Sequence, residues 1–434
     1  MEILKTYKYQ EELNALNQAL TRPFKDAKTI NDLVCQIFIN VRDNKDKALK
    51  EYAKTFDKTD LKEIKVTTEE ITEAISSIDQ NLKNAITTAY ENIRKFHINQ
   101  YNVEKVVNIS EGIQCWRKNA PIEKVGLYIP GGSAPLFSTV LMLSIPANIA
   151  GCKDVSLCTP PNKEGKIHPA ILFAANLCGV KNIYKVGGAQ AIAAMAFGTE
   201  SINKVYKIFG PGNQYVTAAK QLAIDPIWNL GLAIDMPAGP SEVLVYIDSS
   251  GVAAYAAADL LSQAEHGADS QVVLVSSNEN ILNEVRDEVK KQLELLPRKN
   301  IAEAALNYSV SVLVKDKEEA IQMINDYAPE HLILQTKEED FFIERIVNAG
   351  SVFIGNFTPE SAGDYASGTN HTLPTNGYAR SHSGVSVDSF IKKITFQKIS
   401  EEGLKELGPT IEIMAEAEEL MAHKNAVSIR LKKK

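Results

Sequence analysis

The segment around Glu330 and His331 pairs a carboxylate with an imidazole in a pattern that could move protons. It reads DYAPEHL over residues 326–332. An imidazole with a pKa near neutrality is the natural general base for an alcohol proton, and a neighbouring carboxylate could orient it or activate water. Pro329 disfavours helical backbone at Ala328. We therefore expect a helix to stop there and Glu330-His331 to open a strand through an irregular turn. A solvated pair at a strand start is the alternative.

A glutamine and a histidine end another segment that could bind a metal. The residues SQAEH close a helical pattern over 252–266. Gln263 and His266 are three positions apart and lie on the same face of such a helix. His266 could therefore be a metal ligand, although a histidine at a helix end is also favoured simply as a cation near the helix dipole.

The polar stretch 359–371 offers further donors. It reads PESAGDYASGTNH and has neither helical nor strand periodicity, so we expect a long loop. Loops of this kind often carry binding sites. Asp364 could ligate a cation, and His371 could bind an anionic group. A solvated surface loop is the alternative.

Three expected strand-to-helix junctions combine glycine with an amide or a phenol. In a doubly wound sheet, ligands bind beyond the carboxyl ends of the strands. Glycine there lets a phosphate approach the backbone, and the next helix presents free N–H groups. No complete GxGxxG occurs, and ordinary turn glycines are the alternative, but three such junctions together favour a bound nucleotide. The side chains are Tyr128 before PGG at 130–132, Gln190 after GG at 187–188, and Asn213 after GPG at 210–212.

The cysteines offer a different mechanism, in which a thiolate attacks an aldehyde before hydride transfer. Cys115 and Cys158 lie near expected strands, but neither has a histidine nearby in the sequence. Buried structural cysteines are therefore the favoured interpretation. The chain has five cysteines and no CxxC pair, and an odd count argues against a disulfide framework.

Short apolar strands that alternate with helices position these groups. Residues 1–120 are mostly helical in pattern, and the alternation begins at Val125. It indicates parallel sheets covered on both faces. Eight strands are many for one sheet, so we expect two doubly wound sheets that divide near residue 240. The expected strands are 125–130, 154–160, 182–187, 204–210, 242–248, 271–277, 310–316 and 351–355.

The alternation stops after about residue 384. A short strand is expected at 392–400, and helices within 401–407 and 410–424. A segment of about fifty residues is too short to bury a core of its own. This tail must therefore dock on the main body or on a second chain.

The length, composition and charge limit the class of protein to which this chain can belong. The 434 residues are 44% hydrophobic and carry a net charge of −7, which gives no electrostatic reason to expect a nucleic-acid partner. The most apolar stretch, Ser138 to Gly151, is shorter than the roughly 20 residues of a membrane span. The N-terminus lacks the apolar segment of a signal peptide. We expect a cytoplasmic enzyme or binding protein with no membrane association.

Eight stretches together resemble the histidinol dehydrogenase family. They span 125–427 in the family's order and are far more specific than a single glycine loop. The stretches are VGLYIPGGSAPLFSTVLM, VGGAQAIAAMAFGT, GPGNQYV, AGPSEVLV, DLLSQAEHG, APEHLIL, ESAGDYASGTNH and AEELMAHKNAV.

This resemblance implies that L-histidinol is oxidised to L-histidine in two NAD-dependent steps, with one Zn²⁺ per subunit. His331 would take the alcohol proton, and Glu330 would activate the water that hydrates the aldehyde. Two imidazoles with two oxygen donors suit Zn²⁺, and the implied ligands are Gln263, His266, Asp364 and His423. The implied cofactor contacts are Tyr128, Gln190 and Asn213. The implied substrate contacts are Ser241, His371 and Glu418, together with His331 and the zinc ligands.

The resemblance also implies a homodimer in which the tail crosses to the partner subunit, so that His423 and Glu418 complete the other chain's site. On an ideal helix these two residues point about 140° apart. Either the helix distorts before His423, or the two residues approach the site from different sides.

The implied fold is α/β, with two doubly wound Rossmann-like lobes, a helical N-terminal segment and a small C-terminal dimerisation tail. The expected parts are the N-terminal segment 1–25, a larger lobe of 26–129 plus 242–384 with the metal and catalytic residues, a smaller NAD-binding lobe of 130–241, and the tail 385–434.

Two other functions remain open. One is a relative on the same scaffold that oxidises another small alcohol, such as a hydroxy sulfonate. Glu418 and His371 favour the amino alcohol, because a carboxylate suits its ammonium group. The other is a nucleotide-binding protein without catalysis, against which the Glu330-His331 pair and all four ligand positions count.

Overall fold

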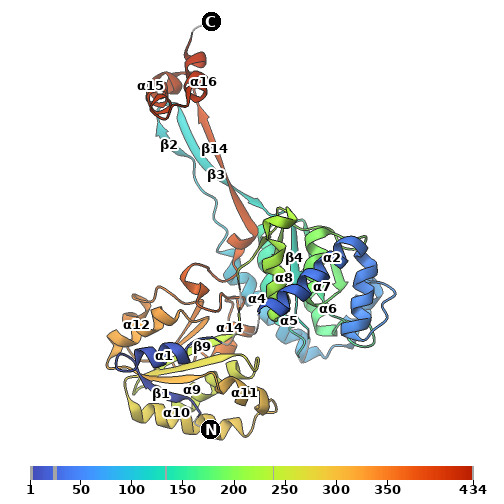
Figure 1. Ribbon diagram of the computed structural model, residues 1–434, viewed down its shortest axis with the longest axis vertical. Helices are drawn as coiled ribbons and strands as arrows, with labels where there is room; N and C mark the ends of the chain where they lie inside the picture. Colours follow the sequence, from blue (N-terminus) through green and yellow to red (C-terminus); the bar gives the residue numbers. More distant parts are fainter. Residues whose placement is uncertain (1–2, 23–26, 132–133, 238, 433–434) are drawn as a thin grey trace.

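Two parallel sheets and one antiparallel sheet organise the chain (Figure 1). The computed structural model describes residues 3–22, 27–131, 134–237 and 239–432. The strand orders are β1-β11-β10-β9-β12-β13, β6-β5-β4-β7-β8 and β14-β3-β2. All eight predicted α/β strands are confirmed, and the two parallel sheets divide between Ile234 and Glu242, as predicted. The expectations that involve Gly132, Ala238, the start of the N-terminal segment and the last two lysines fall partly outside the described residues.

The six-stranded sheet contains β1 (Lys5–Lys8), β9 (Glu242–Ile247), β10 (Gln271–Ser276), β11 (Val310–Leu313), β12 (His331–Gln335) and β13 (Ser351–Ile354). The five-stranded sheet contains β4 (Lys124–Tyr128), β5 (Asp154–Thr159), β6 (Asn182–Lys185), β7 (Lys207–Phe209) and β8 (Ala233–Ile234). The antiparallel sheet contains β2 (Val107–Ser110), β3 (Ile113–Pro121) and β14 (Ile391–Ile399).

The longer helices are α1 (Leu13–Ala19), α2 (Ala27–Tyr52), α3 (Thr68–Ser77), α4 (Gln80–Ile98), α5 (Phe137–Ala150), α6 (Pro169–Leu177), α7 (Gly188–Phe197), α8 (Gln214–Ala223), α9 (Ala253–Ala264), α10 (Glu279–Leu293), α11 (Lys299–Leu306), α12 (Lys317–Tyr327), α15 (Glu401–Ala417) and α16 (Met421–Leu431). The shorter ones are α13 (Glu339–Ile343), α14 (Glu360–Tyr365), η1 (Ala53–Asp57), η2 (Pro226–Trp228), η3 (Tyr378–Arg380) and η4 (Val387–Phe390).

The central strands of the six-stranded sheet are apolar on both faces. In β9, Val243 and Val245 face a core formed with α9, α10 and α11, whereas Leu244 and Tyr246 face a core formed with α1 and α12. Each such side chain contributes about 1.5–3 kcal/mol when it is fully buried. Burial on both faces explains why these strands are continuous apolar runs rather than alternating ones.

The five-stranded sheet is covered by the N-terminal helices as well as by its own. Val34, Phe38 and Val41 of α2 share a core with α7 and α8 on one face, and α4 joins α5 and α6 on the other. The expected grouping of 26–129 with the catalytic lobe therefore differs from the packing of these helices. The apolar faces of α2 and α4 pack on the five-stranded sheet instead. The first residues are also not wholly helical, because β1 pairs in parallel with β11 before α1 begins.

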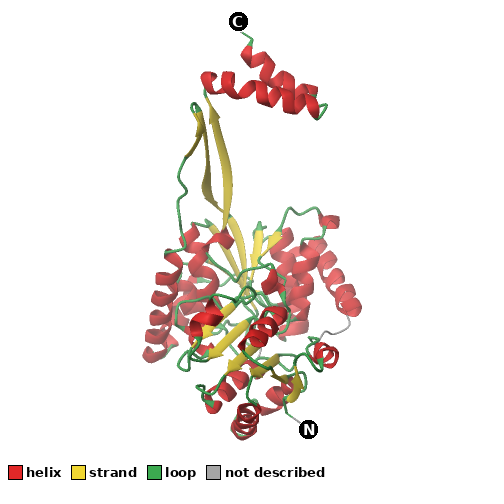
Figure 2. Ribbon diagram, turned by 90° about the vertical axis from the view of Figure 1, so that its left-hand side faces the viewer, coloured by secondary structure: helices red, strands yellow, loops and turns green. Residues whose placement is uncertain are grey.

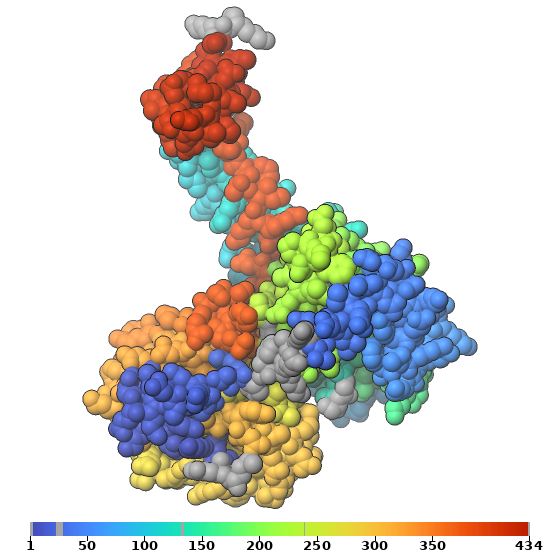
Figure 3. Space-filling view, viewed as in Figure 1, coloured from blue at the N-terminus to red at the C-terminus, as the bar shows by residue number. Residues whose placement is uncertain are grey.

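The antiparallel sheet is an arm that carries α15 and α16 away from both parallel sheets (Figures 2 and 3). Its long strands β3 and β14 pair over their whole length. The tail was expected to dock on the main body or on a second chain. Its first residues pack on the body, where Val387 and Phe390 join the core of the five-stranded sheet, whereas the arm holds α15 and α16 away from it (Figure 1). Residues 401–417 form one helix through Pro409 rather than two, and Glu419 at φ 60° separates it from the next.

This break resolves the geometric conflict between Glu418 and His423. Glu418 follows the last turn of α15, and His423 lies in the first turn of α16. The helix therefore distorts before His423, which was one of the two expected solutions. Among the described residues, no helix has the length and apolar character of a membrane span.

Candidate active site

Glu330 and His331 lie where the sequence predicts them. Helix α12 ends at Tyr327, Ala328 adopts a left-handed conformation with φ 54°, and His331 is the first residue of β12. Both side chains are buried, at 6% and 4% exposure. Nδ1 of His331 lies 3.7 Å from Oε2 of Glu330. The irregular turn brings both groups to one site, so they are not a solvated pair.

The first residue of β9 holds both groups through its main chain. The N–H of Glu242 donates to Oε2 of Glu330 at 2.9 Å. The carbonyl oxygen of Glu242 lies 3.3 Å from Nδ1 of His331. Because a carbonyl only accepts, Nδ1 carries the proton and Nε2 carries the lone pair. Nε2 has no hydrogen-bond partner in the described chain and lies 3.7 Å from Oδ1 of Asp364.

Burial sets the charge states of this pair. It lowers the pKa of His331 to about 4, so the imidazole is neutral and its Nε2 can accept a proton. The pKa of Glu330 is raised well above its usual value, first by burial and then by the negative charges of Glu242 and Asp364. A raised pKa makes an ionised carboxylate a stronger base toward water.

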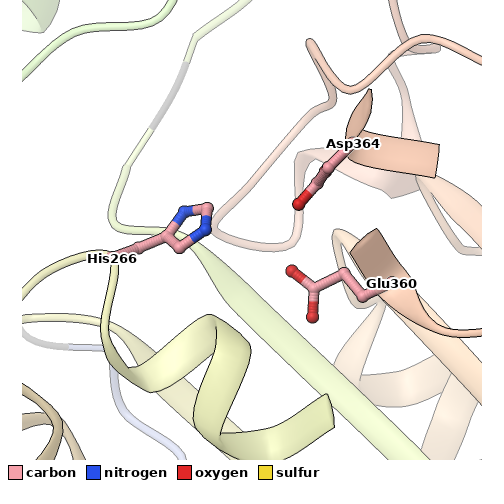
Figure 4. Close-up of side chains that lie close together, drawn as sticks. All are labelled: His266, Glu360 and Asp364. Carbon is pink, nitrogen blue, oxygen red and sulfur yellow. The ribbon is translucent and has the colours of Figure 1, made fainter. Parts of the chain in front are cut away.

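A possible metal site faces His331. Ligand atoms of His266, Glu360 and Asp364 all lie within 4.8 Å of one another. His266 follows the end of α9, and the two carboxylates point toward its imidazole from α14 (Figure 4). The prediction of a long loop at 359–371 is wrong here, because α14 forms directly after Pro359. A six-residue helix is too short to leave a periodic pattern, but it puts Glu360 and Asp364 on one face.

Glu360 was missed from the sequence. Its side chain is fully buried, and Oε1 has no hydrogen-bond partner among the described residues. Burial raises its pKa, and the charges of Asp364, Glu330 and Asp259 raise it further. The only sequence signal was the i, i+4 spacing of Glu360 and Asp364, which the glycine and serine around them obscured. Such a group of buried carboxylates favours a cation.

The buried amide of Gln263 lacks hydrogen-bond partners in the described chain, which fits a role as a metal ligand. The side chain is fully buried, and both of its polar atoms lack a hydrogen-bond partner in the described chain. It lies in the last turn of α9, three residues before His266, which follows the end of that helix. A buried amide without a partner is costly, so an absent ligand explains it. Imidazole, amide and carboxylate donors are suitable for Zn²⁺.

The segment after α14 contacts the helices of the other parallel sheet. The amide of Asn92 on α4 donates to the carbonyl of Ala366 at 2.9 Å. Asn370 donates to the carbonyl of Met142 on α5 at 2.7 Å. The site therefore lies beside the junction of the two sheets.

His371 has both ring nitrogens engaged. Nδ1 donates to the carbonyl of Asp364 at 2.8 Å, and Nε2 lies 3.1 Å from Oγ1 of Thr139. Burial lowers the pKa of His371, so the ring is neutral. These contacts fix the position of Asp364. Binding of an anionic group by His371 stays a prediction.

The structure does not bring all of the predicted site residues together within one chain. Ser241 directly precedes β9 and is half-buried. Glu418 and His423 are exposed on the α15–α16 pair at the far end of the arm (Figure 1). His423 therefore does not reach the metal site of its own chain.

The three glycine junctions line a separate cavity of about 1030 Å³ at the carboxyl ends of the five-stranded sheet. The Tyr128 hydroxyl accepts from the N–H of Gly188 at 3.0 Å, and Gln190 is buried. Asn213 caps α8 by accepting from the N–H groups of Tyr215 and Val216. The N–H groups expected to be free at that junction are therefore satisfied. At α8 only the cavity favours a ligand, whereas α7 begins at the same cavity without a side-chain cap.

The glycine at 187 has a packing role. A Cβ at Gly187 would lie 2.5 Å from Cβ of Pro160, so this junction requires glycine whether or not a ligand binds.

The cysteines agree with a structural role, because all five are free. Cys158 is fully buried, and burial raises the pKa of its thiol. Cys115 lies in β3 of the arm. A thiolate mechanism has no support.

The comparisons with known proteins give the family. The histidinol dehydrogenase family model matches residues 20–431. The chain belongs to the histidinol dehydrogenase family. The histidinol dehydrogenase of Bacteroides thetaiotaomicron is 59% identical over 414 residues, which cover 95% of this chain and 96% of that one. The chloroplastic histidinol dehydrogenase of Arabidopsis thaliana is 52% identical over 99% of this chain and 92% of that one.

A crystal structure agrees with this assignment. The histidinol dehydrogenase of Elizabethkingia anophelis has 56% sequence identity and a TM-score of 0.95, with 99% of each chain covered. Membership of the histidinol dehydrogenase family makes the chain an oxidoreductase. The α/β fold with parallel sheets is the fold of that relative.

The pH dependence of stability tests whether Asp57 is a buried carboxylate with a raised pKa. It lines the cavity from η1, and burial raises its pKa to about 6. Between the ordinary pKa and about 6 the folded state binds more protons than the unfolded state. Stability therefore falls as the pH rises through this range, and the full cost of the buried carboxylate applies above about 6. We expect Asp57→Asn to raise the melting temperature at pH 8 and to change it little at pH 4. The exposed Asp60 provides the matched control, Asp60→Asn. An equal shift at both pH values for Asp57→Asn would contradict the assignment.

Proposed function

We propose that this chain oxidises L-histidinol to L-histidine through L-histidinal, with two NAD⁺ and one Zn²⁺ per subunit. The observation that carries the proposal is the neutral, buried His331. Its Nε2 lacks a partner among the described residues and faces Asp364 of the possible metal site. A base in this state beside a metal site suits removal of the proton from an alcohol. The names of the relatives support histidinol as that alcohol.

The metal would be held by Gln263, His266 and Asp364, with His423 of a second copy as the fourth ligand. Zn²⁺, when bound, holds and orients the substrate, which is the template role of a metal ion. Glu360 brings a further carboxylate to the same place. The three donors in this chain fit the metal, because the Gln263 amide has no partner in the described chain.

The residues of the chain then move the protons. In the first step, His331 accepts the hydroxyl proton at Nε2 while the hydride leaves to the nicotinamide of NAD⁺. Glu330 next takes a proton from the water that adds to the aldehyde and releases it to solvent, while His331 returns its proton to the aldehyde oxygen. This gives the neutral hydrate and restores the lone pair at Nε2 of His331. In the last step, His331 accepts a proton from the resulting hydrate as the second hydride leaves. Each oxidation thus removes one hydride and one proton, and the product is the acid.

Binding is assigned to two groups of residues. Tyr128, Gln190 and Asn213 would contact NAD⁺ in the cavity at the carboxyl ends of the five-stranded sheet, most of whose strands belong to the proposed NAD-binding lobe, 130–241. Ser241, His371 and Glu418 would contact the substrate. The Glu418 carboxylate suits the ammonium group, which favours an amino alcohol over a hydroxy sulfonate.

A homodimer with shared sites is the second part of the proposal. The tail leaves the body of its own chain along the arm (Figure 2). It exposes large apolar side chains, including Ile413 at 68%, Met414 at 61% and Ile429 at 61%. Exposed apolar groups of this kind mark interaction surfaces. Crossing to a partner would cover them and bring His423 and Glu418 to a site that lacks them.

The stoichiometry of NADH tests the reaction. We expect two NADH per L-histidinol consumed, loss of activity with a chelator, and recovery with Zn²⁺. One NADH would mean that the reaction stops at the aldehyde and that Glu330 has another role. No NADH, with turnover of a different alcohol, would favour the other-substrate alternative. A zinc content near zero in active protein would contradict the metal assignment.

His331→Asn tests the base. We expect turnover to fall by about 10²–10⁴-fold, since general-base catalysis contributes that much. Zinc content and NAD⁺ binding should be unchanged. The surface histidine His382 provides the control, and His382→Asn should keep wild-type turnover. Near-normal turnover of His331→Asn would remove His331 from the mechanism.

Complementation tests the crossing tail. His266→Ala damages the body and His423→Ala damages the tail, so each variant alone should be inactive. A heterodimer of the two has one site with both residues intact. Random pairing should therefore restore about a quarter of the wild-type activity. The control pairs His266→Ala with Asp364→Ala, two defects of the body, and should stay inactive. No recovery in isolated His266→Ala/His423→Ala heterodimers would exclude shared sites.

A further inference from the structure

The main chain of Glu242 holds both Glu330 and His331, and its own side chain is anchored elsewhere. The N–H of Glu242 binds Glu330, and its carbonyl binds His331. Glu242 therefore sets the position of Glu330 and the direction of the His331 lone pair. Any contact that holds Glu242 in place therefore also holds Glu330 and His331 in place.

Arg22 is the partner that fixes the Glu242 side chain. Its Nε and Nη2 donate to the two carboxylate oxygens of Glu242 at 2.5 and 3.0 Å, as a bidentate pair. Nη2 also donates to the carbonyl of Tyr327 at 2.8 Å. The guanidinium lies 4.2 Å from the centre of the Tyr327 ring. The pair is almost fully covered, with 15% exposure of the Arg22 side chain and 1% of Glu242.

These contacts join three segments that are distant in sequence. Arg22 follows α1, Glu242 opens β9, and Tyr327 ends α12 just before Glu330. The Tyr327 hydroxyl further donates to the side-chain oxygen of Gln271 at 2.8 Å. Arg22 thus ties the end of the helix before Glu330 to the strand whose main chain holds Glu330.

We propose that Arg22 and Glu242 form a clamp that positions Glu330 and His331 for catalysis. The proposal rests on the proposed roles of those two residues. Both members of the clamp are positioning residues, because they act through the main chain at 242 and through the end of α12. A buried ion pair is weak evidence for stability alone, since an apolar pair can replace it without loss. Its geometry here instead specifies where two reactive side chains lie.

The physical consequence of losing Arg22 follows from burial. Without the guanidinium, the buried Glu242 carboxylate keeps only neutral donors, namely the Tyr327 hydroxyl and main-chain N–H groups. It must turn toward water or take up a proton, and the backbone at 242 shifts with it. A misplacement of about 1 Å can cost on the order of 100-fold in rate while the substrates still bind.

The test compares Arg22→Met, Arg22→Lys and Glu242→Gln with Tyr9→Phe. Tyr9 docks the same N-terminal segment through a hydrogen bond to Asp326, and among the described residues it makes no hydrogen bond to Arg22 or Glu242. For Arg22→Met we expect kcat to fall roughly 10–100-fold. KM for L-histidinol and NAD⁺, and zinc content, should stay near wild type. Arg22→Lys should recover part of kcat. Tyr9→Phe should lower only the melting temperature.

A second readout does not depend on turnover. The Nδ1–H tautomer of His331, measured by ¹⁵N NMR with histidine-labelled protein and assigned with His331→Asn, should be present in the wild type and depleted in Arg22→Met. Normal kcat and an unchanged tautomer would overturn the clamp, as would a higher KM with unchanged kcat. If Arg22→Met does not fold, Glu242→Gln gives the same two readouts. A wild type that keeps the tautomer but does not oxidise L-histidinol would instead contradict the proposed function.

Discussion

Glu330 and His331 are buried polar groups, and the hydrogen bonds from the main chain of β9 make their burial possible. The N–H and the carbonyl of Glu242 satisfy one atom of each, which leaves Nε2 of His331 free to accept a proton. The register of the sheet produces this contact, since His331 pairs with Val243, next to Glu242. The parallel pairing of β12 with β9 therefore determines the direction of the base.

Several carboxyl groups lie close together beside the starts of β9 and β12. Glu330, Glu360 and Asp364 lie close to one another, and burial together with their mutual repulsion raises the pKa of both glutamates. Gln263, His331 and Glu360 each have at least one buried polar atom without a partner among the described residues. A protein retains such groups where a ligand compensates them, and here a divalent cation and the ammonium group of an amino alcohol have the matching charge.

The two parallel sheets use opposite ends of their strands. The cavity lined by Tyr128 lies at the carboxyl ends of the five-stranded sheet, where the general rule for α/β sheets places a ligand. Glu242 and His331 instead are the first residues of β9 and β12, and His266 follows the end of α9. The groups to which we assign reactivity thus come from strand starts and a helix end, which have no glycine-rich signature.

Most of the candidate ligands could be named from residue types and from the family resemblance. The strands, the division of the two sheets near 240 and the turn at Pro329 could also be predicted from the sequence. These features depend on local patterns of apolar residues and on backbone restrictions. Tertiary structure decided the rest. Helix α2 packs on the five-stranded sheet, α14 brings in Glu360, and Arg22 reaches Glu242 across 220 residues. Such contacts depend on which surfaces meet after folding, and no local pattern of residues records that.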